Sequence, residues 1–280
     1  MRKYLELTKF EHTLFALPFA LASVVILYKE APSLWKLFWI VVAFVSARTA
    51  GMALNRLIDL PIDRLNPRTK DWVHARGEVS EEEIKRLVLV SCGVFLLSCL
   101  MINLYAFLLS PVVLFLLWFY PYSKRITYYP HLVLGAVYFL IPLAVDVALN
   151  ESVSIDALLL GFAMAFWVAG FDILYALQDY EFDKSYGIKS IPVKFGIQGA
   201  IKIARFFHLL TFLFLLMLLL RVEFLGPFYL LGLLAIAGFL YYEHSLIKPN
   251  DLSKLNKAFF TTNAYISVVY FAVVLIDRLL

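Results

Sequence analysis

Long apolar runs are the feature that most constrains this chain. Nine of them recur almost to the C-terminus, at residues 12–28, 37–55, 87–104, 106–121, 131–149, 156–177, 203–220, 225–242 and 258–276. A bilayer core about 30 Å thick needs about 20 helical residues to cross it. Only 16% of the residues are charged and 62% are apolar, whereas a soluble domain carries roughly 25% charged residues. The sequence therefore predicts an all-α, multi-pass transmembrane helical bundle.

Lysine and arginine residues indicate how this bundle lies in the membrane. If the N-terminus is cytoplasmic, nine spans place 19 of these residues on the cytoplasmic side and 4 on the other side. Cytoplasmic loops carry such an excess, so we expect an inner-membrane protein with its N-terminus and its long loops, 56–86 and 178–202, in the cytoplasm. Long loops are often functional. Orientation also explains the basic loops, and no nucleic-acid partner is expected.

Two acidic motifs end the second and the sixth apolar runs. The first contains Asn55, Asp59 and Asp63, and the second contains Asp172, Asp179 and Asp183. Asp59 and Asp179 are 120 residues apart, as are Asp63 and Asp183. Because this offset equals four spans, we expect one domain, 1–280, with an internal duplication of about 1–121 and 131–242 and a ninth helix added. Symmetric repeats with a site between them recur in membrane proteins.

The spacing of the acidic residues indicates metal binding. Residues four apart on a helix share one face, so each motif presents two carboxylates to one point. Two facing pairs would repel unless cations bridged them, and oxygen ligands with incomplete protein coordination favour Mg²⁺ together with phosphate oxygens. The implied ligand is a diphosphate. The nearby cations that could contact it are Arg64, Arg68, Lys184 and Lys189. The alternative, that these acids only cap helix ends at the interface, explains the matched positions less well.

Arg48 lies within the second apolar run. It shares a helical face with Asn55 and Asp59 to within about 40° and lies roughly 10 Å deeper than Asn55. A buried arginine in a membrane indicates function, and one below a metal–diphosphate site would suit the carboxylate of an aromatic substrate. The alternative is a structural ion pair, for instance with Asp172. The five histidines show no ligand spacing, and we expect them in surface or packing roles.

Together these residues resemble the UbiA-type membrane prenyltransferases. The matching stretches are Lys9-Phe-Glu-His-Thr-Leu-Phe-Ala-Leu-Pro18, Ala53-Leu-Asn-Arg-Leu-Ile-Asp59 with Asp63, Asn66-Pro-Arg-Thr69, Tyr120-Pro-Tyr-Ser-Lys-Arg125, Gly170-Phe-Asp-Ile-Leu-Tyr-Ala-Leu-Gln-Asp179 with Asp183, and Gly187-Ile-Lys-Ser-Ile-Pro192. The resemblance implies nine helices around a central cavity that opens laterally to lipid. It also implies transfer of a polyprenyl chain from its diphosphate to an aromatic ring carbon, with Mg²⁺ as cofactor.

The resemblance also implies roles for single residues. Arg48 matches the position that binds the carboxylate of the acceptor, and we expect Lys124 among the diphosphate ligands. The positions that match Mg²⁺–diphosphate ligands are Asn55, Asp59, Asp63, Asp179 and Asp183. We expect the catalytic carboxylates to be Asp183, which would remove the ring proton, and Asp172.

The substrate indicated is an aromatic carboxylic acid of quinone biosynthesis. The chain is similar to 4-hydroxybenzoate polyprenyltransferases and to relatives that prenylate 1,4-dihydroxy-6-naphthoate in the menaquinone pathway, and Arg48 would serve either carboxylate. A secondary membrane transporter is the rival from another class. Transporters place coupling charges near the midplane on broken helices, whereas these acids end their helices at the interface.

One stretch departs from the family pattern. Between Thr69 and Val79 the family usually shows Arg-x-x-Pro-x-Gly, whereas this chain reads Lys-Asp-Trp-Val-His-Ala-Arg-Gly-Glu. The missing proline predicts a different loop shape and questions the role of Arg76.

Overall fold

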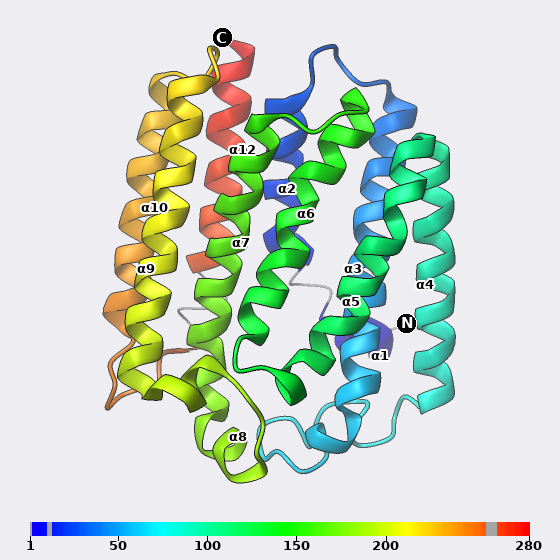
Figure 1. The fold of residues 1–280 in the computed structure, drawn as a ribbon, viewed down its shortest axis with the longest axis vertical. Helices are drawn as coiled ribbons and strands as arrows, with labels where there is room; N and C mark the ends of the chain where they lie inside the picture. The colour runs from blue at the N-terminus through cyan, green and yellow to red at the C-terminus, as the bar shows by residue number, and fades with distance from the viewer. Residues whose placement is uncertain (1, 10–12, 256–261) are drawn as a thin grey trace. The chain divides into compact units, whose positions relative to one another are not determined.

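The computed structural model describes residues 2–9, 13–255 and 262–280. Residues 10–12 of the first matching stretch and 258–261 of the ninth apolar run therefore lie outside the described residues. The helices are α1 (Arg2–Leu7), α2 (Thr13–Leu27), α3 (Leu34–Asp63), α4 (Glu81–Ile102), α5 (Leu104–Ile126), α6 (Pro130–Asn150), α7 (Ile155–Ala176), the 3₁₀ turn η2 (Leu177–Asp179), α8 (Tyr180–Tyr186), α9 (Ile191–Arg221), α10 (Pro227–Leu246) and α12 (Asn263–Leu279) (Figure 1).

The prediction of an all-α, multi-pass membrane fold is confirmed. Each of the nine predicted runs falls on a long helix of the described chain. Six helices, with α7 counted together with its continuation to Tyr186, are long and apolar enough to cross a membrane.

The predicted bounds of the loops 56–86 and 178–202 are partly wrong. Helix α3 continues to Asp63, and α9 already begins at Ile191. Apolar runs mark only the part of a helix in hydrocarbon, whereas backbone hydrogen bonding continues into water without apolar side chains. The whole first acidic motif is therefore helical.

The chain forms two compact units. Unit 1 contains Met1–Thr13 and Pro32–Ile126, and unit 2 contains Leu14–Ala31 and Thr127–Leu280. Most of α2 thus belongs to unit 2, where Phe19 stacks on the rings of Trp167 and Tyr270. The predicted internal duplication stays a prediction.

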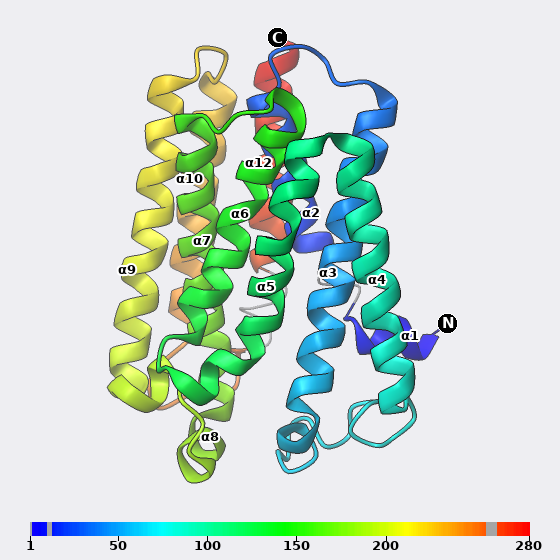
Figure 2. The same cartoon turned by 45° about the vertical axis from the view of Figure 1, so that its right-hand side comes forward.

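Unit 1 is built on α3, which runs beside α4 (Figure 2). Helix α4 begins with a capping box in which Ser80 and Glu83 satisfy each other's backbone N–H groups. The Glu83 carboxylate also accepts hydrogen bonds from Lys3 at 2.7 Å and from the Tyr4 hydroxyl at 2.8 Å. The bond from Lys3 raises the pKa of its ammonium above the ordinary value. Through these contacts α1 is fixed to the first turn of α4.

Unit 2 depends on close approach between helices. Helix α7 contacts both α6 and α9, and a Cβ added at Gly161 would lie 2.9 Å from the Phe139 carbonyl oxygen of α6. Asp277 of α12 caps the start of α10 by accepting hydrogen bonds from the backbone N–H groups of Gly226 and Tyr229 at 2.8 and 2.7 Å. Helix α9 is kinked at Gly196, whose φ of 71° favours glycine.

The close contact at Gly161 yields the first prediction. We expect Gly161→Ala to destabilise the protein by about 1–3 kcal/mol because the new methyl group would force α6 and α7 apart. The measurement is the thermal unfolding midpoint of detergent-solubilised protein. Gly238→Ala in α10 is the matched control, because a Cβ there meets nothing within 4 Å. We expect this control to leave stability unchanged or to raise it by up to about 1 kcal/mol. Equal midpoints for both variants would contradict the prediction.

Candidate functional site

The first acidic motif occupies the last turns of α3. Asn55, Asp59 and Asp63 follow one another at four-residue spacing and so share a face of the helix. The two aspartates are buried, with Asp59 3% and Asp63 8% exposed. A buried carboxylate is costly unless it is paired, so its partners show how the site is stabilised.

Asp59 is held by cations from the end of α5. Lys124 Nζ lies 2.6 Å from Asp59 Oδ2, and Arg125 Nη1 lies 3.4 Å from Oδ1. Asn55 Nδ2 donates to Oδ2 at 2.9 Å. Arg125 is fixed in turn, because its Nη2 donates to the Ile58 carbonyl at 2.9 Å. The buried carboxylate is therefore compensated by two cations and one amide.

Asp63 is held by a histidine for which the sequence predicts only a surface or packing role. His74 Nε2 lies 2.8 Å from Asp63 Oδ2, and His74 is 1% exposed. Thr69 Oγ1 donates to the Asp63 carbonyl at 2.8 Å, which fixes the start of the loop that carries His74. No spacing signal could have found this pair, because the loop returns to α3 after 11 residues of irregular backbone.

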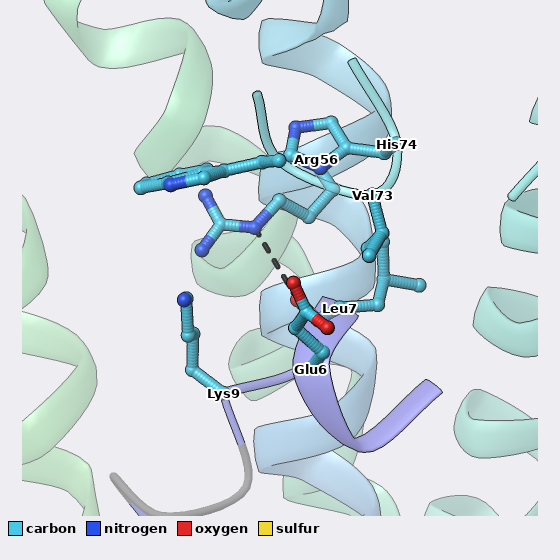
Figure 3. A pocket seen from close by; sticks show the side chains of 7 residues that line it. Glu6, Leu7, Lys9, Arg56, Val73 and His74 are labelled. Carbon is cyan, nitrogen blue, oxygen red and sulfur yellow. Dashed lines mark hydrogen bonds between the residues drawn. The ribbon is translucent and has the colours of Figure 1, made fainter. Parts of the chain in front are cut away.

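Trp72 lies at the centre of the loop that departs from the family pattern, and cationic side chains surround its ring. The guanidinium of Arg56 lies 4.3 Å from the centre of the indole, and Arg68 and Lys9 Nζ each lie 5.2 Å from it. Figure 3 shows Arg56 donating through Nε to the Leu7 carbonyl, at 3.3 Å. A small pocket lies here, lined by Glu6, Leu7, Lys9, Arg56, Trp72, Val73 and His74.

Three other basic residues of unit 1 are placed differently. Arg76 pairs with Glu78 at 3.0 Å and is about half exposed, so it lies at the surface. Arg64 is exposed at the C-cap of α3. The Arg48 Nε atom is buried and has no hydrogen-bond partner in the part of the chain that the structure describes. Such an orphaned donor has the capacity to bind an anionic group.

The second motif spans a change of helix. Asp172 lies in α7, Asp179 ends the 3₁₀ turn, and Asp183 lies in α8, which continues below α7 (Figure 1). Helix α8 ends at Tyr186 and is capped by Gly187, which adopts a left-handed φ of 69° and donates its N–H to the Asp183 carbonyl. The D-x3-D spacing predicted one continuous helix for this motif. The structure instead divides the motif between α7, η2 and α8.

Asp172 is also held by a histidine. His131 Nδ1 lies 2.7 Å from Asp172 Oδ2, and the backbone N–H of Ile191 points at His131 Nε2 at 3.4 Å. His131 is 3% exposed and follows Pro130 in the first turn of α6. The sequence predicts only a surface or packing role for this histidine, whereas its ring contacts a motif carboxylate.

The basic residues of unit 2 lie against aromatic rings. Lys184 Nζ is 5.8 Å from the centre of the Tyr180 ring, and Lys189 Nζ is 5.8 Å from that of Tyr128. Lys194 donates to the Tyr129 hydroxyl at 2.8 Å. The expected roles of Lys184 and Lys189 toward diphosphate stay predictions.

The side-chain oxygens of the two motifs are donors of the type that magnesium binds. Among the described residues there is no group of three or more His, Cys, Asp or Glu side chains placed to hold a metal ion. Mg²⁺ typically uses one or two carboxylates and completes its shell with water and substrate phosphate. Each motif offers carboxylates of this kind.

Comparison with known proteins gives one consistent result. A profile of the UbiA prenyltransferase family matches residues 16–267. The 4-hydroxybenzoate octaprenyltransferase of Hahella chejuensis is 33% identical over 246 residues, which are 88% of this chain and 81% of the relative. The apo structure of a UbiA homologue from Aeropyrum pernix K1 superposes with a TM-score of 0.86 at 31% identity, covering 95% of this chain and 98% of that one. A UbiA homologue from Archaeoglobus fulgidus bound to DMAPP and Mg²⁺ shares the fold, with a TM-score of 0.74 at 22% identity over 99% of both chains.

The cluster around Trp72 yields the second prediction. We expect Trp72→Leu to speed tryptic cleavage within loop 64–80 by about 5-fold or more, because each cation–aromatic contact contributes roughly 0.5–2 kcal/mol and cleavage follows the open population. Trp72→Phe keeps an aromatic face and should be cleaved at nearly the wild-type rate. Cleavage in loop 247–255 is the internal control. If Trp72→Leu and wild type were cut equally fast, the indole would not be what orders this loop.

Proposed function

The chain belongs to the UbiA prenyltransferase family, and on that premise we propose that it transfers a polyprenyl chain to an aromatic carboxylic acid in quinone biosynthesis. The acceptor we favour is 4-hydroxybenzoate, because relatives 30–35% identical carry that name. The alternative acceptor is 1,4-dihydroxy-6-naphthoate in the menaquinone pathway. Family membership favours this enzyme over the rival transporter. The observation that carries the proposal is the buried Asp59 carboxylate with its cationic partners, at the end of the first motif helix.

The donor is proposed to bind through its diphosphate. The Mg²⁺ ligands in this proposal are Asn55, Asp59, Asp63, Asp179 and Asp183. The cations proposed to contact phosphate oxygens are Arg64, Arg68, Lys124, Lys184 and Lys189. Magnesium, when bound, would offset charge on the departing diphosphate. Lys124 is well placed for its role because its ammonium already lies at a motif carboxylate, where an incoming anion and its metal would exchange partners with it.

The acceptor is proposed to bind through its carboxylate to Arg48, whose buried Nε lacks a partner among the described residues. The donor's allylic C–O bond breaks, and its electron pair leaves with the diphosphate. A ring carbon of the acceptor then supplies the electron pair of the new C–C bond. The proton displaced from that carbon passes to a carboxylate, for which Asp183 and Asp172 are the candidates.

We also propose an orientation in the membrane. The excess of lysine and arginine on one set of loops supports a cytoplasmic N-terminus and cytoplasmic acidic motifs. In a bacterial cell this corresponds to the inner membrane.

The third prediction tests the activity itself. Purified protein given a long-chain polyprenyl diphosphate and 4-hydroxybenzoate should form prenylated product only with Mg²⁺, measured by chromatography and by released diphosphate. Asp59→Asn and Asp179→Asn should each lower kcat/KM by about 10²-fold or more, because each removes an electrostatic contact at the reacting centre. A parallel assay with 1,4-dihydroxy-6-naphthoate decides between the acceptors. If neither acceptor gave prenylated product, the proposal would be refuted.

The fourth prediction concerns Arg48. Arg48→Gln should raise the KM for the aromatic acid about 10–100-fold, because a hydrogen bond between charged groups contributes roughly 1.5–3 kcal/mol. The KM for the polyprenyl diphosphate should stay unchanged. As a control, a phenol without the carboxylate should react equally with both proteins. A rise in the donor KM instead would assign Arg48 to the diphosphate.

A further inference from the structure

Each acidic motif has one carboxylate that is held by a buried histidine. We propose that His74 and His131 are positioning residues, which fix the orientation of Asp63 for metal binding and of Asp172 for proton transfer. This inference rests on the proposed function.

His74 can act on Asp63 in only one way. An ionised carboxylate only accepts hydrogen bonds, so the 2.8 Å contact requires His74 to donate Nε2–H to Asp63 Oδ2. His74 Nδ1 is buried and has no hydrogen-bond partner in the described chain. The contact from Nε2 to Asp63 is therefore the hydrogen bond that this ring makes among the described residues. One carboxylate oxygen is thereby fixed, and Oδ1 is left for another ligand.

His131 is fixed on both sides. Its Nε2 faces the backbone N–H of Ile191 and must therefore accept, so Nδ1 carries the hydrogen and donates to Asp172 Oδ2 at 2.7 Å. The ring belongs to the first turn of α6, and the N–H to the first turn of α9. Two helix starts therefore determine the tautomer and orientation of the ring, and through it the orientation of the Asp172 side chain, which is 19% exposed.

These contacts have different expected consequences. Hydrogen-bond partners of metal ligands commonly change metal affinity 10–100-fold when they are removed. The His74 contact should therefore control metal affinity. Asp172 is proposed as a proton acceptor, so the His131 contact should control turnover instead. A histidine that only filled space would affect neither quantity selectively.

The experiment compares two kinds of substitution at each histidine. His74→Gln and His131→Asn each place an amide N–H near the position of the donating ring nitrogen, whereas His74→Leu and His131→Leu keep bulk and remove the donor. The probe for metal affinity is Mn²⁺ with inorganic pyrophosphate, followed by electron paramagnetic resonance. Turnover is measured as kcat and KM with 4-hydroxybenzoate and a polyprenyl diphosphate. Thermal unfolding of every variant identifies those that are folded.

For His74 we expect Leu to weaken Mn²⁺ binding about 10-fold or more and Gln to restore it to within a few-fold of wild type. For His131 we expect Leu to lower kcat about 10-fold with an unchanged Mn²⁺ affinity and an unchanged KM, and Asn to restore kcat. Equal effects of the Leu and amide variants on these quantities, or an effect on unfolding alone, would overturn the inference. If the wild-type protein bound no Mn²⁺ with pyrophosphate and formed no product, the proposed function would fail instead.

Discussion

Hydrocarbon offers a polypeptide backbone no hydrogen-bond partner, and every other feature of this protein follows from that constraint. Each unsatisfied backbone group in lipid costs several kcal/mol, so spanning segments must be helical. Charged side chains are costly there too, and the acidic motifs accordingly lie at the ends of apolar helices. Helix α3 shows the result: Leu34–Asp63 is one continuous helix whose apolar part gives way to Asn55, Asp59 and Asp63. Rigid helices thus carry the acidic groups. The spacing of these groups in the sequence determines the distances between them in three dimensions.

The same constraint determines how the charged groups are paired. Asp59 is 3% exposed and depends on Lys124, Arg125 and Asn55 for compensation. Removing one partner of a buried ion pair leaves an uncompensated charge, which is strongly destabilising. The pairing of Asp59 with Lys124 and Arg125 therefore links the end of α5 firmly to the end of α3. In the proposed function Lys124 would contact phosphate oxygens, and Asp59 would be among the residues that hold magnesium. A site built in this way avoids an uncompensated charge in both states, so the groups that hold the apo site together are those that would bind the donor.

Periodicity and charge in the sequence predicted the class of fold and the helices, because these depend on local chemistry. The ends of α3 and α9 were misplaced because hydropathy marks the bilayer and not the hydrogen-bonded helix. The break at Leu177–Asp179 was missed because nothing in that stretch forbids a continuous helix. His74 and His131 were missed for a different reason. Their partners lie 11 and 41 residues away in the sequence, and only the path of the backbone brings the rings to the carboxylates.

The loop that departs from the family pattern is held by contacts of its own. Residues 70–78 lack the expected proline, yet the loop remains ordered around Trp72, whose indole collects Arg56, Arg68 and Lys9. The ring also ties the loop to α1, because Arg56 donates to the Leu7 carbonyl. An aromatic face tolerates several cations at once and releases each at small cost. If Arg68 leaves the indole for a phosphate oxygen, Arg56 and Lys9 still hold the ring, and His74 stays on Asp63. Under the proposed function, a ring shared among cations would therefore let one of them contact the substrate while the carboxylate beside it keeps its partner.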